Sequence, residues 1–283
     1  MQIITTIKEM QAQSDELRRA GKRIGFVPTM GYLHEGHLSL LDLAKQYSNV
    51  RVMSIFVNPT QFAPTEDLAQ YPRDFVRDER LASNRGCDIL FYPETQEMYP
   101  VPYRTYVLVE ELTARLCGTS RPTFFRGVTT VVAKLFNIVK PHIAVFGQKD
   151  AQQALVIKQM IRDLNLDLEI IIGPIVREPD GLAMSSRNQY LSPLERADAL
   201  ALSQSLTKAK ELIDTGERDT NIIKTAMTKI LTTTVSAKID YIEIVSSDNL
   251  APLATIAGEV LIAIAVWIGK TRLIDNLMLR VAE

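Results

Sequence analysis

Two histidines in the segment PTMGYLHEGH could bind the phosphates of a nucleotide. His34 and His37 are three residues apart, so in the first turn of a helix their side chains can face the same side. Gly36 lies between them and lets a phosphate approach the backbone closely. The N–H groups and the dipole at a helix start also attract anions. The segment therefore predicts a phosphate site, with a pair of structural histidines at the surface or the core edge as the alternative.

A zinc site is a weaker alternative for the same histidines. HEGH lacks the HExxH spacing of zinc proteases, and the chain has only one other histidine, His142. We expect His142, directly after Pro141, to be structural. We expect no metal site that is built from protein side chains alone.

Three further polar segments could bind parts of a substrate. NPTQF contains Asn58 and Gln61, and GQKD contains Lys149 and Asp150. Lys149 suits a phosphate, whereas Asp150 suits a ribose hydroxyl or a magnesium-bound water. In MSSRN two serines precede Arg187, which is a composition that can hold phosphate. Each segment alone could be an ordinary turn, helix cap or linker loop, so their joint placement carries the information.

The elements that must position these segments alternate between short apolar runs and longer amphipathic stretches. This alternation is typical of a parallel sheet with crossover helices. We predict helices over residues 38–47, 67–86 with an interruption at Pro72, 129–139 and 152–164. We predict strands over residues 24–27, 51–57, 88–92, 104–109, 143–146 and 168–172. The first three polar segments then fall at the carboxyl ends of strands, where α/β folds bind ligands.

The pattern changes after about Val176. Two helical stretches and three apolar runs follow, over residues 193–212, 220–234, 239–246, 259–268 and, more weakly, 271–277. We therefore predict an α/β fold with two domains. Residues 1–175 form a Rossmann-like parallel sheet with helices on both faces, and residues 176–283 form a smaller α+β domain with a short antiparallel sheet. We expect MSSRN to lie near this junction and the second domain to close over the site.

Composition and charge disfavour several classes of protein. Lys and Arg number 32 against 33 Asp and Glu, so the chain lacks the basic excess of a nucleic-acid-binding protein. The most apolar run, 260–268, is far shorter than the roughly 20 residues of a membrane-spanning helix, and we predict a buried strand there. No signal-peptide or lipidation pattern is evident, and Cys87 and Cys117 lack metal or redox spacing. We expect a cytoplasmic protein with reduced, partly buried cysteines.

Together the four segments resemble the motif set of the pantothenate synthetase (pantoate–β-alanine ligase) family. PTMGxLHxGH, NPxQF, GxKD with QQ just beyond, and MSSRN occur in that order between Pro28 and Asn188. HxGH with a serine-rich loop also resembles the wider nucleotidylyltransferase superfamily, whereas the pair Gln61 and Gln153 resembles the ligase alone. The resemblance implies ATP-dependent condensation of (R)-pantoate with β-alanine. A pantoyl-adenylate would be the intermediate, and AMP and pyrophosphate would be released.

The resemblance implies a role for each motif residue. Gln61 would bind pantoate and β-alanine, Gln153 would bind pantoate, and Asn58 would belong to the substrate site. A neutral amide orients a carboxylate without pairing with it as an arginine would. The implied catalytic residues are His34, His37, Lys149, Ser185, Ser186 and Arg187, with His37 described as a proton donor in similar enzymes. The implied ATP contacts are Met30, Gly31, Tyr32, Leu33, His34, Glu35, Gly36, His37, Gly147, Gln148, Lys149, Asp150, Val176, Met184, Ser185, Ser186 and Arg187, with backbone contact alone at Tyr32 and Gln148.

Three other functions stay open on the sequence. A nucleotidylyltransferase would pass AMP to a phosphorylated acceptor, and Gln61 with Gln153 argue against it. A class I synthetase-like fragment that binds transfer RNA would need a basic face, which the charge balance disfavours. A nucleotide-binding module without turnover would tolerate replacement of the histidines. The ligase interpretation implies ATP and Mg²⁺, pantoate and β-alanine as small-molecule substrates, no nucleic-acid or membrane partner, and a homodimer.

Overall fold

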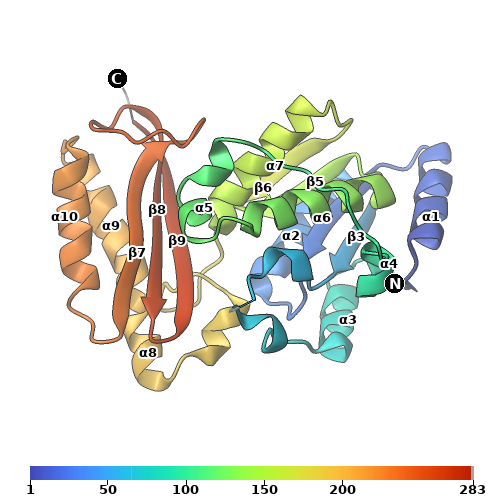
Figure 1. The fold of residues 1–283 in the computed structure, drawn as a ribbon, viewed down its shortest axis with the longest axis horizontal. Helices are drawn as coiled ribbons and strands as arrows, with labels where there is room; N and C mark the ends of the chain where they lie inside the picture. Colours follow the sequence, from blue (N-terminus) through green and yellow to red (C-terminus); the bar gives the residue numbers. More distant parts are fainter. Residues whose placement is uncertain (65, 282–283) are drawn as a thin grey trace. The chain divides into compact units, whose positions relative to one another are not determined.

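The computed structural model describes residues 1–64 and 66–281, which form two compact units (Figure 1). The first unit comprises Met1–Thr113, Arg121–Gln148 and Gln153–Pro174. The second comprises Ala114–Ser120, Lys149–Gln152 and the chain from Ile175 onward. Two short segments from the N-terminal part of the chain thus belong with the C-terminal residues.

A six-stranded parallel sheet forms the centre of the first unit. Its order is β1-β4-β3-β2-β5-β6, and every neighbouring pair is parallel. The strands are β1 (Gln2–Ile4), β2 (Ile24–Thr29), β3 (Val50–Ile55), β4 (Ile89–Phe91), β5 (Ile143–Gly147) and β6 (Glu169–Gly173). The predicted α/β class and its parallel sheet are confirmed. The sequence pattern missed β1, which has only three residues and pairs with β4 alone.

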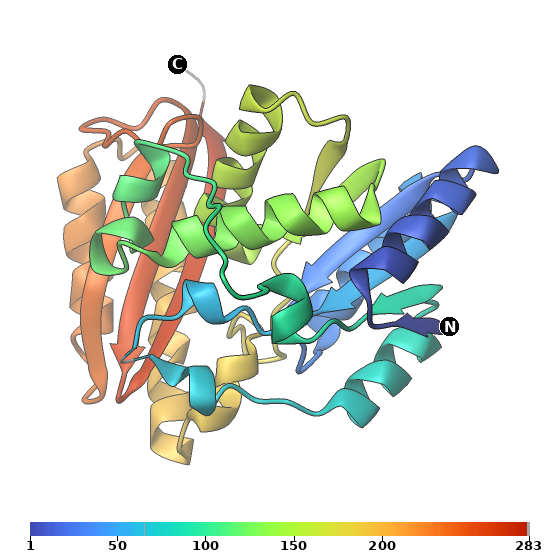
Figure 2. The same cartoon turned by 45° about the vertical axis from the view of Figure 1, so that its right-hand side comes forward.

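Helices cover both faces of this sheet. On one face Val27 and Val145 of the strands pack in a core with α2 (Glu35–Tyr47) and α3 (Phe75–Asn84). Neighbouring strand residues point to opposite faces, and Phe146 packs against Phe136 of α6 (Phe124–Val139) with 6.4 Å between ring centroids. Helix α1 (Ile7–Arg19) contacts α6 and β2. Figure 2 shows α1 and α3 on opposite sides of the strands.

The chain changes direction across the sheet between β2 and β5, which are hydrogen-bonded neighbours. From β2 it runs outward to β3 and β4, and from β5 it runs the other way through α7 (Ala151–Asp163) to β6. Right-handed crossovers in opposite directions place their helices on opposite faces. Open α/β sheets bind ligands at the carboxyl ends of the strands where this reversal occurs.

The second unit contains a three-stranded antiparallel sheet of order β7-β8-β9. Its core joins the sheet to α9 and α10 through residues such as Ile262, Leu206 and Met227, and Figure 1 shows both helices on the same side of the sheet. The elements are α8 (Pro193–Asp198), α9 (Leu200–Asp214), α10 (Thr220–Leu231), β7 (Ala237–Ser246), β8 (Gly258–Ile268) and β9 (Thr271–Val281). The predicted small antiparallel sheet and the buried strand at 260–268 are confirmed.

Two predictions of secondary structure were wrong or too broad. Residues 104–109 do not form a strand. Instead, the N–H of Val107 donates to Thr130 Oγ1 and its carbonyl accepts from Thr129 Oγ1, so two threonines of α6 take the place of a strand partner. The stretch predicted as helical over 67–86, with an interruption at Pro72, forms a 3-10 turn at Asp67–Ala69 and is α-helical only from Phe75, where Asp74 caps α3.

Within the part of the chain that the structure describes, no helix is both long and apolar enough to cross a membrane.

Candidate active site

His34 and His37 lie side by side at the start of α2. His34 is the N-cap residue, and the two ring centroids are 4.0 Å apart. The His34 N–H donates to Nδ1 of His37 at 3.4 Å. A neutral imidazole that accepts at Nδ1 carries its proton on Nε2. His37 can therefore present an N–H donor beside the N-terminus of a helix, which favours an anion.

A buried carboxylate holds the turn that leads to these histidines. Asp78 of α3 accepts the N–H of Tyr32 at 2.6 Å and the N–H of Leu33 at 2.7 Å. Gly31 has φ +84°, and a Cβ there would lie 2.9 Å from Ile55 Cγ2, so the turn requires glycine. Burial raises the pKa of Asp78, and its two backbone hydrogen bonds oppose that rise.

Three of the predicted ATP contacts already bond within the protein. The N–H groups of Tyr32 and Leu33 already donate to Asp78, and the Leu33 side chain is buried in the core. Glu35 pairs with Arg85. The N–H groups of Tyr32 and Leu33 and the Glu35 carboxylate therefore already have partners within the protein.

Asn58 and Gln61 form a buried amide pair just beyond β3. Gln61 belongs to a 3-10 turn, η1 (Pro59–Gln61), and Asn58 is its N-cap. Their exposed fractions are 1% for Asn58 and 8% for Gln61. Asn58 Nδ2 donates to Gln61 Oε1 at 3.0 Å, and Gln61 Nε2 lies 3.0 Å from the sulfur of Met30. The structure thus brings the predicted substrate residues Asn58 and Gln61 together with the predicted ATP contact Met30.

Gly127 permits the close packing of α6 on this turn. A Cβ at residue 127 would lie 2.4 Å from the carbonyl oxygen of Thr60 and 2.7 Å from Cα of Gln61. Both are main-chain atoms, which cannot rotate away. The sequence did not indicate Gly127 as a site residue, because its constraint arises from a segment more than sixty positions earlier.

The GQKD segment forms a tight turn between β5 and α7. Residues Gln148–Asp150 make a 3-10 helix, η4. The Lys149 side chain is half-buried and Asp150 is exposed. Within the second unit, Asn276 of β9 donates to the Lys149 carbonyl at 3.0 Å, which fixes the backbone from which the lysine extends.

The two glutamines that follow GQKD differ in their surroundings. Gln152 is buried, accepts the N–H of Cys117 at 3.0 Å and donates to the Arg115 carbonyl at 2.7 Å. Gln153 is only half-buried. Gln152 therefore has a structural role, which leaves Gln153 as the candidate for substrate contact.

The MSSRN loop is held at both ends. Met184 N–H donates to the Val176 carbonyl at 3.0 Å, so these two predicted ATP contacts are neighbours. Asn188 Nδ2 donates to Glu178 Oε1 at 2.7 Å and to the Ala183 carbonyl at 3.1 Å. Between these anchors Ser185 caps the turn η5 (Ser186–Tyr190), and its Oγ accepts the N–H of Arg187 at 3.3 Å. The segment is therefore not an ordinary solvated linker.

Residues of strand β9 contact Lys149 of the GQKD segment and the chain just ahead of the MSSRN loop, the two segments predicted to bind phosphate. Asp275 is 2% exposed and binds the Arg177 guanidinium at 2.7 and 3.0 Å, just ahead of the MSSRN loop. The next residue, Asn276, holds Lys149 as described above. In the sequence, these two residues stand out only as an adjacent acid and amide inside the strand pattern TRLIDNL. The apolar pattern of this run indicated only a weak strand.

The remaining histidine and the cysteines have structural surroundings. His142 Nδ1 accepts the N–H of Ile24 at 2.9 Å, which joins the starts of β5 and β2. Burial and the nearby Arg18 and Arg23 lower the pKa of His142. Cys87 and Cys117, which were expected to be partly buried, are both buried, and burial raises the pKa of the Cys87 thiol to about 12. Across the described ranges, no three His, Cys, Asp or Glu side chains form a cluster that could hold a metal ion.

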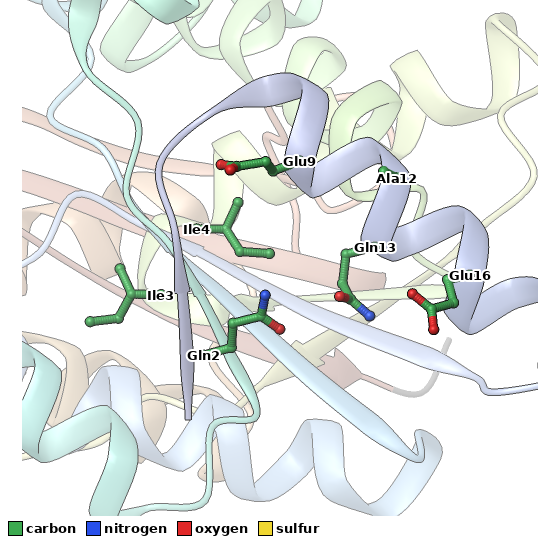
Figure 3. A pocket seen from close by; sticks show the side chains of 7 residues that line it. All are labelled: Gln2, Ile3, Ile4, Glu9, Ala12, Gln13 and Glu16. Carbon is green, nitrogen blue, oxygen red and sulfur yellow. The ribbon is translucent and has the colours of Figure 1, made fainter.

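A pocket of about 290 Å³ lies between β1 and α1 at the edge of the parallel sheet (Figure 3). Its lining contains none of the predicted site residues, and consists of Gln2, Ile3, Ile4, Glu9, Ala12, Gln13 and Glu16.

Comparisons with known proteins agree with the motif pattern. Residues 2–278 match the family described as pantoate-beta-alanine ligase. A pantothenate synthetase of Thermotoga petrophila is 58% identical over 279 residues, covering 99% of this chain and 100% of the relative. A crystal structure of pantothenate synthetase from Thermus thermophilus has a TM-score of 0.93 at 42% identity, covering 98% of this chain and 99% of that one. A pantoate-beta-alanine ligase from Francisella tularensis, complexed with beta-gamma ATP and beta-alanine, has a TM-score of 0.81 at 35% identity, covering 98% of this chain and 97% of that one. The chain therefore belongs to the pantoate–β-alanine ligase family.

Proposed function

We propose how this ligase divides its chemistry among its residues. The pantoate carboxylate attacks the α-phosphorus of ATP, which gives pantoyl-adenylate and pyrophosphate. The amine of β-alanine then attacks the acyl carbon and releases AMP. The first step needs no proton transfer, so it depends on positioning and on neutralising charge at the phosphate oxygens.

His34 and His37 act as donors to the triphosphate. The observation that carries this assignment is their position side by side at the start of α2. This helix follows β2, one of the two strands between which the chain reverses its direction across the sheet. The His37 ring accepts at Nδ1, so in its neutral form Nε2 carries the proton and is the donor. A donor that is already oriented loses little free energy to reorganisation when charge develops on the phosphates. Met30, Gly31, Gly36 and the backbone of residues 32–35 contribute the adjoining surface.

Lys149, Ser185, Ser186 and Arg187 supply the remaining charge and donors to the phosphates. Lys149 and Arg187 are cations that can pair with phosphate oxygens, and the serines add neutral donors. Gly147, Gln148, Val176 and Met184 contribute main-chain contacts to ATP. Support comes from two contacts of β9 within the second unit. Asn276 holds the backbone carbonyl of Lys149, and Asp275 binds the side chain of Arg177, which precedes the MSSRN loop.

Mg²⁺ accompanies ATP in this proposal. Magnesium usually keeps several waters and takes one or two carboxylates together with substrate phosphates. The single carboxylate of Asp150 on the exposed turn η4 fits that role through a bound water. The ion would supply charge neutralisation to the phosphates.

Gln61 and Gln153 orient pantoate, and Gln61 also faces β-alanine. An amide can hydrogen-bond a carboxylate or hydroxyl without neutralising the nucleophile, as an arginine would do. Asn58 supports Gln61 directly through its hydrogen bond to Oε1. The buried amide pair supports this assignment, because buried polar groups retain one geometry only when they are hydrogen-bonded.

We further propose that the enzyme works as a cytoplasmic homodimer whose C-terminal domain, residues 176–283, closes over the substrates bound by residues 1–175. The family resemblance and the need for ATP support these assignments. Light scattering would report the dimer, cell fractionation the compartment, and small-angle scattering with and without ATP the closure.

The test of the assignment uses substrate omission. With ATP and pantoate alone, the enzyme should release pyrophosphate once per active site and retain the adenylate. Addition of β-alanine should then release AMP. AMP transfer to a phosphorylated acceptor, with no AMP release on adding β-alanine, would instead support a nucleotidylyltransferase.

A further inference from the structure

The amide of Gln61 can present either of two opposite ends to a substrate. Its nitrogen donates hydrogen bonds and its oxygen accepts them, so a half-turn of the amide reverses its preference. A carboxylate oxygen of the acid only accepts hydrogen bonds and therefore requires the donating end. Something in the protein must therefore fix which end faces the acid.

Backbone groups fix the orientation of Asn58, the neighbour of Gln61. Asn58 Nδ2 lies 3.1 Å from the carbonyl oxygen of Gly127. The opposite atom, Oδ1, lies 3.4 Å from the N–H of Thr60. A carbonyl oxygen only accepts and a backbone N–H only donates, so the nitrogen of Asn58 must face Gly127.

The orientation of Asn58 in turn fixes the orientation of the Gln61 amide. The second hydrogen on Asn58 Nδ2 points to Gln61 Oε1 at 3.0 Å, so the oxygen of Gln61 is engaged inside the protein. Its Nε2 then faces Met30, whose sulfur lies 3.0 Å away. A thioether is a weak acceptor, and a substrate oxygen at that point would make the stronger bond.

Tyr99 completes the chain of hydrogen bonds. Its hydroxyl donates to Asn58 Oδ1 at 2.8 Å, from a ring that packs against Tyr103 with centroids 4.9 Å apart. The Tyr99 side chain is 9% exposed. Burial raises the pKa of Tyr99 to about 12, so its hydroxyl stays protonated and remains a donor at neutral pH.

We propose that Tyr99 is a positioning residue that acts through Asn58 to hold Gln61 with its N–H₂ end toward the acid. The relay runs from Tyr99 OH to Asn58 Oδ1 and from Asn58 Nδ2 to Gln61 Oε1. It selects an acid that offers hydrogen-bond acceptors, such as a carboxylate with an adjacent hydroxyl oxygen, at Gln61 Nε2. This inference rests on the proposed role of Gln61 in binding pantoate.

The variant Tyr99→Phe keeps the ring and removes the donor. We expect KM for pantoate to rise about three- to tenfold, the effect of one lost hydrogen bond. KM for ATP and kcat should stay within about twofold. Tyr103→Phe is the matched control, because it removes a hydroxyl from the same aromatic group outside the relay, and its kinetic constants should match those of the parent.

A double-mutant cycle separates positioning from general stability. Gln61→Ala should itself raise KM for pantoate, and Tyr99→Phe should add nothing in that background, because its effect passes through Gln61. Additive effects, or parallel losses of pantoate and ATP affinity with a lower Tm, would overturn the relay. If Gln61→Ala weakens pantoate binding and Tyr99→Phe does not, the relay is wrong and the role of Gln61 stands. If Gln61→Ala leaves KM for pantoate unchanged, the role of Gln61 fails first and the relay fails with it.

Discussion

The polar groups around Gln61 and those of the MSSRN loop are stabilised in different ways. Asn58 and Gln61 are almost fully buried, and they bond to each other, to Tyr99 and to the backbone of Gly127. In the loop, by contrast, Ser185 and Arg187 are half-buried, and the anchoring hydrogen bonds described above lie at the loop ends, at Met184 and Asn188.

This difference matches what each region is proposed to bind. An acid that has to attack in line needs one fixed geometry, which a fully bonded buried network provides. A phosphate chain needs charge and donors that can close around it, which a loop anchored at its ends provides. The expected kinetic signature is a separation of KM for pantoate from KM for ATP between variants of the two regions.

Replacement of His37 by Ala should have the largest effect. It removes an oriented donor at the phosphates, so the rate of adenylate formation should fall about 10²–10⁴-fold. The affinity for pantoate should change little, because the amide network is untouched. Rapid-quench measurement of pyrophosphate release gives the rate, with His142→Asn as a control away from the site. A rate equal to the parent's would show that the histidines do not act on the phosphates.

Gly127→Ala should have the next largest effect and should act on pantoate. The added Cβ would lie 2.4 Å from the Thr60 carbonyl oxygen, so the η1 turn must move and carry Gln61 with it. We expect KM for pantoate to rise about 10–10²-fold and stability to fall by about 1–3 kcal/mol, the usual cost of overpacking. The control Ala133→Gly, at a buried position of the same helix, should cost about 1 kcal/mol or more of stability and adds no atom that could displace the turn. Equal KM effects in the two variants would contradict the account.

Asn188→Ala should have a smaller effect, and it should act on ATP rather than on pantoate. It removes the hydrogen bonds to Glu178 and Ala183 that hold one end of the loop. KM for ATP should rise about three- to tenfold while KM for pantoate stays the same. The exposed neighbour Gln189 offers a control in Gln189→Ala. A change in KM for pantoate alone would break the proposed separation of the two regions.

The smallest expected effect is on the pH dependence of stability, through His142, which lies outside both regions. His142 accepts the Ile24 N–H, and its pKa in the folded chain lies below the ordinary value of 6.5. Its contribution to stability is therefore present above about pH 6.5 and is lost as the pH falls through the folded-state pKa. Chemical denaturation at about pH 7.5 and pH 5.5 should show a larger loss in the parent than in His142→Asn. An equal loss in both proteins would assign the pH dependence to other groups.

Local patterns in the sequence predicted the strands and the motif positions. The apolar runs IAVF and RVMSIFV overlap β5 and β3, because a parallel strand that is buried on both faces requires largely apolar residues. The motifs at their ends then follow from topology. The spacing of His34 and His37 likewise predicted that their rings share one side, as the 4.0 Å centroid distance confirms.

The supporting residues could not be predicted in this way, because their constraints come from distant parts of the chain. Asp78, Tyr99 and Gly127 act on segments 41 to 69 positions away. The predicted strand at 104–109 failed for the same reason, since threonines of α6 take up its backbone groups. Single-sequence patterns record local periodicity and do not record such partners.

The most direct test of the central claim labels the pantoate carboxylate with oxygen-18. If the carboxylate held by Gln61 attacks the α-phosphorus, one labelled oxygen remains on that phosphorus when β-alanine displaces AMP. Mass spectrometry should then find a single oxygen-18 in AMP and none in pyrophosphate. Unlabelled AMP, or label in pyrophosphate, would contradict attack at the α-phosphorus and the account of the site built on it.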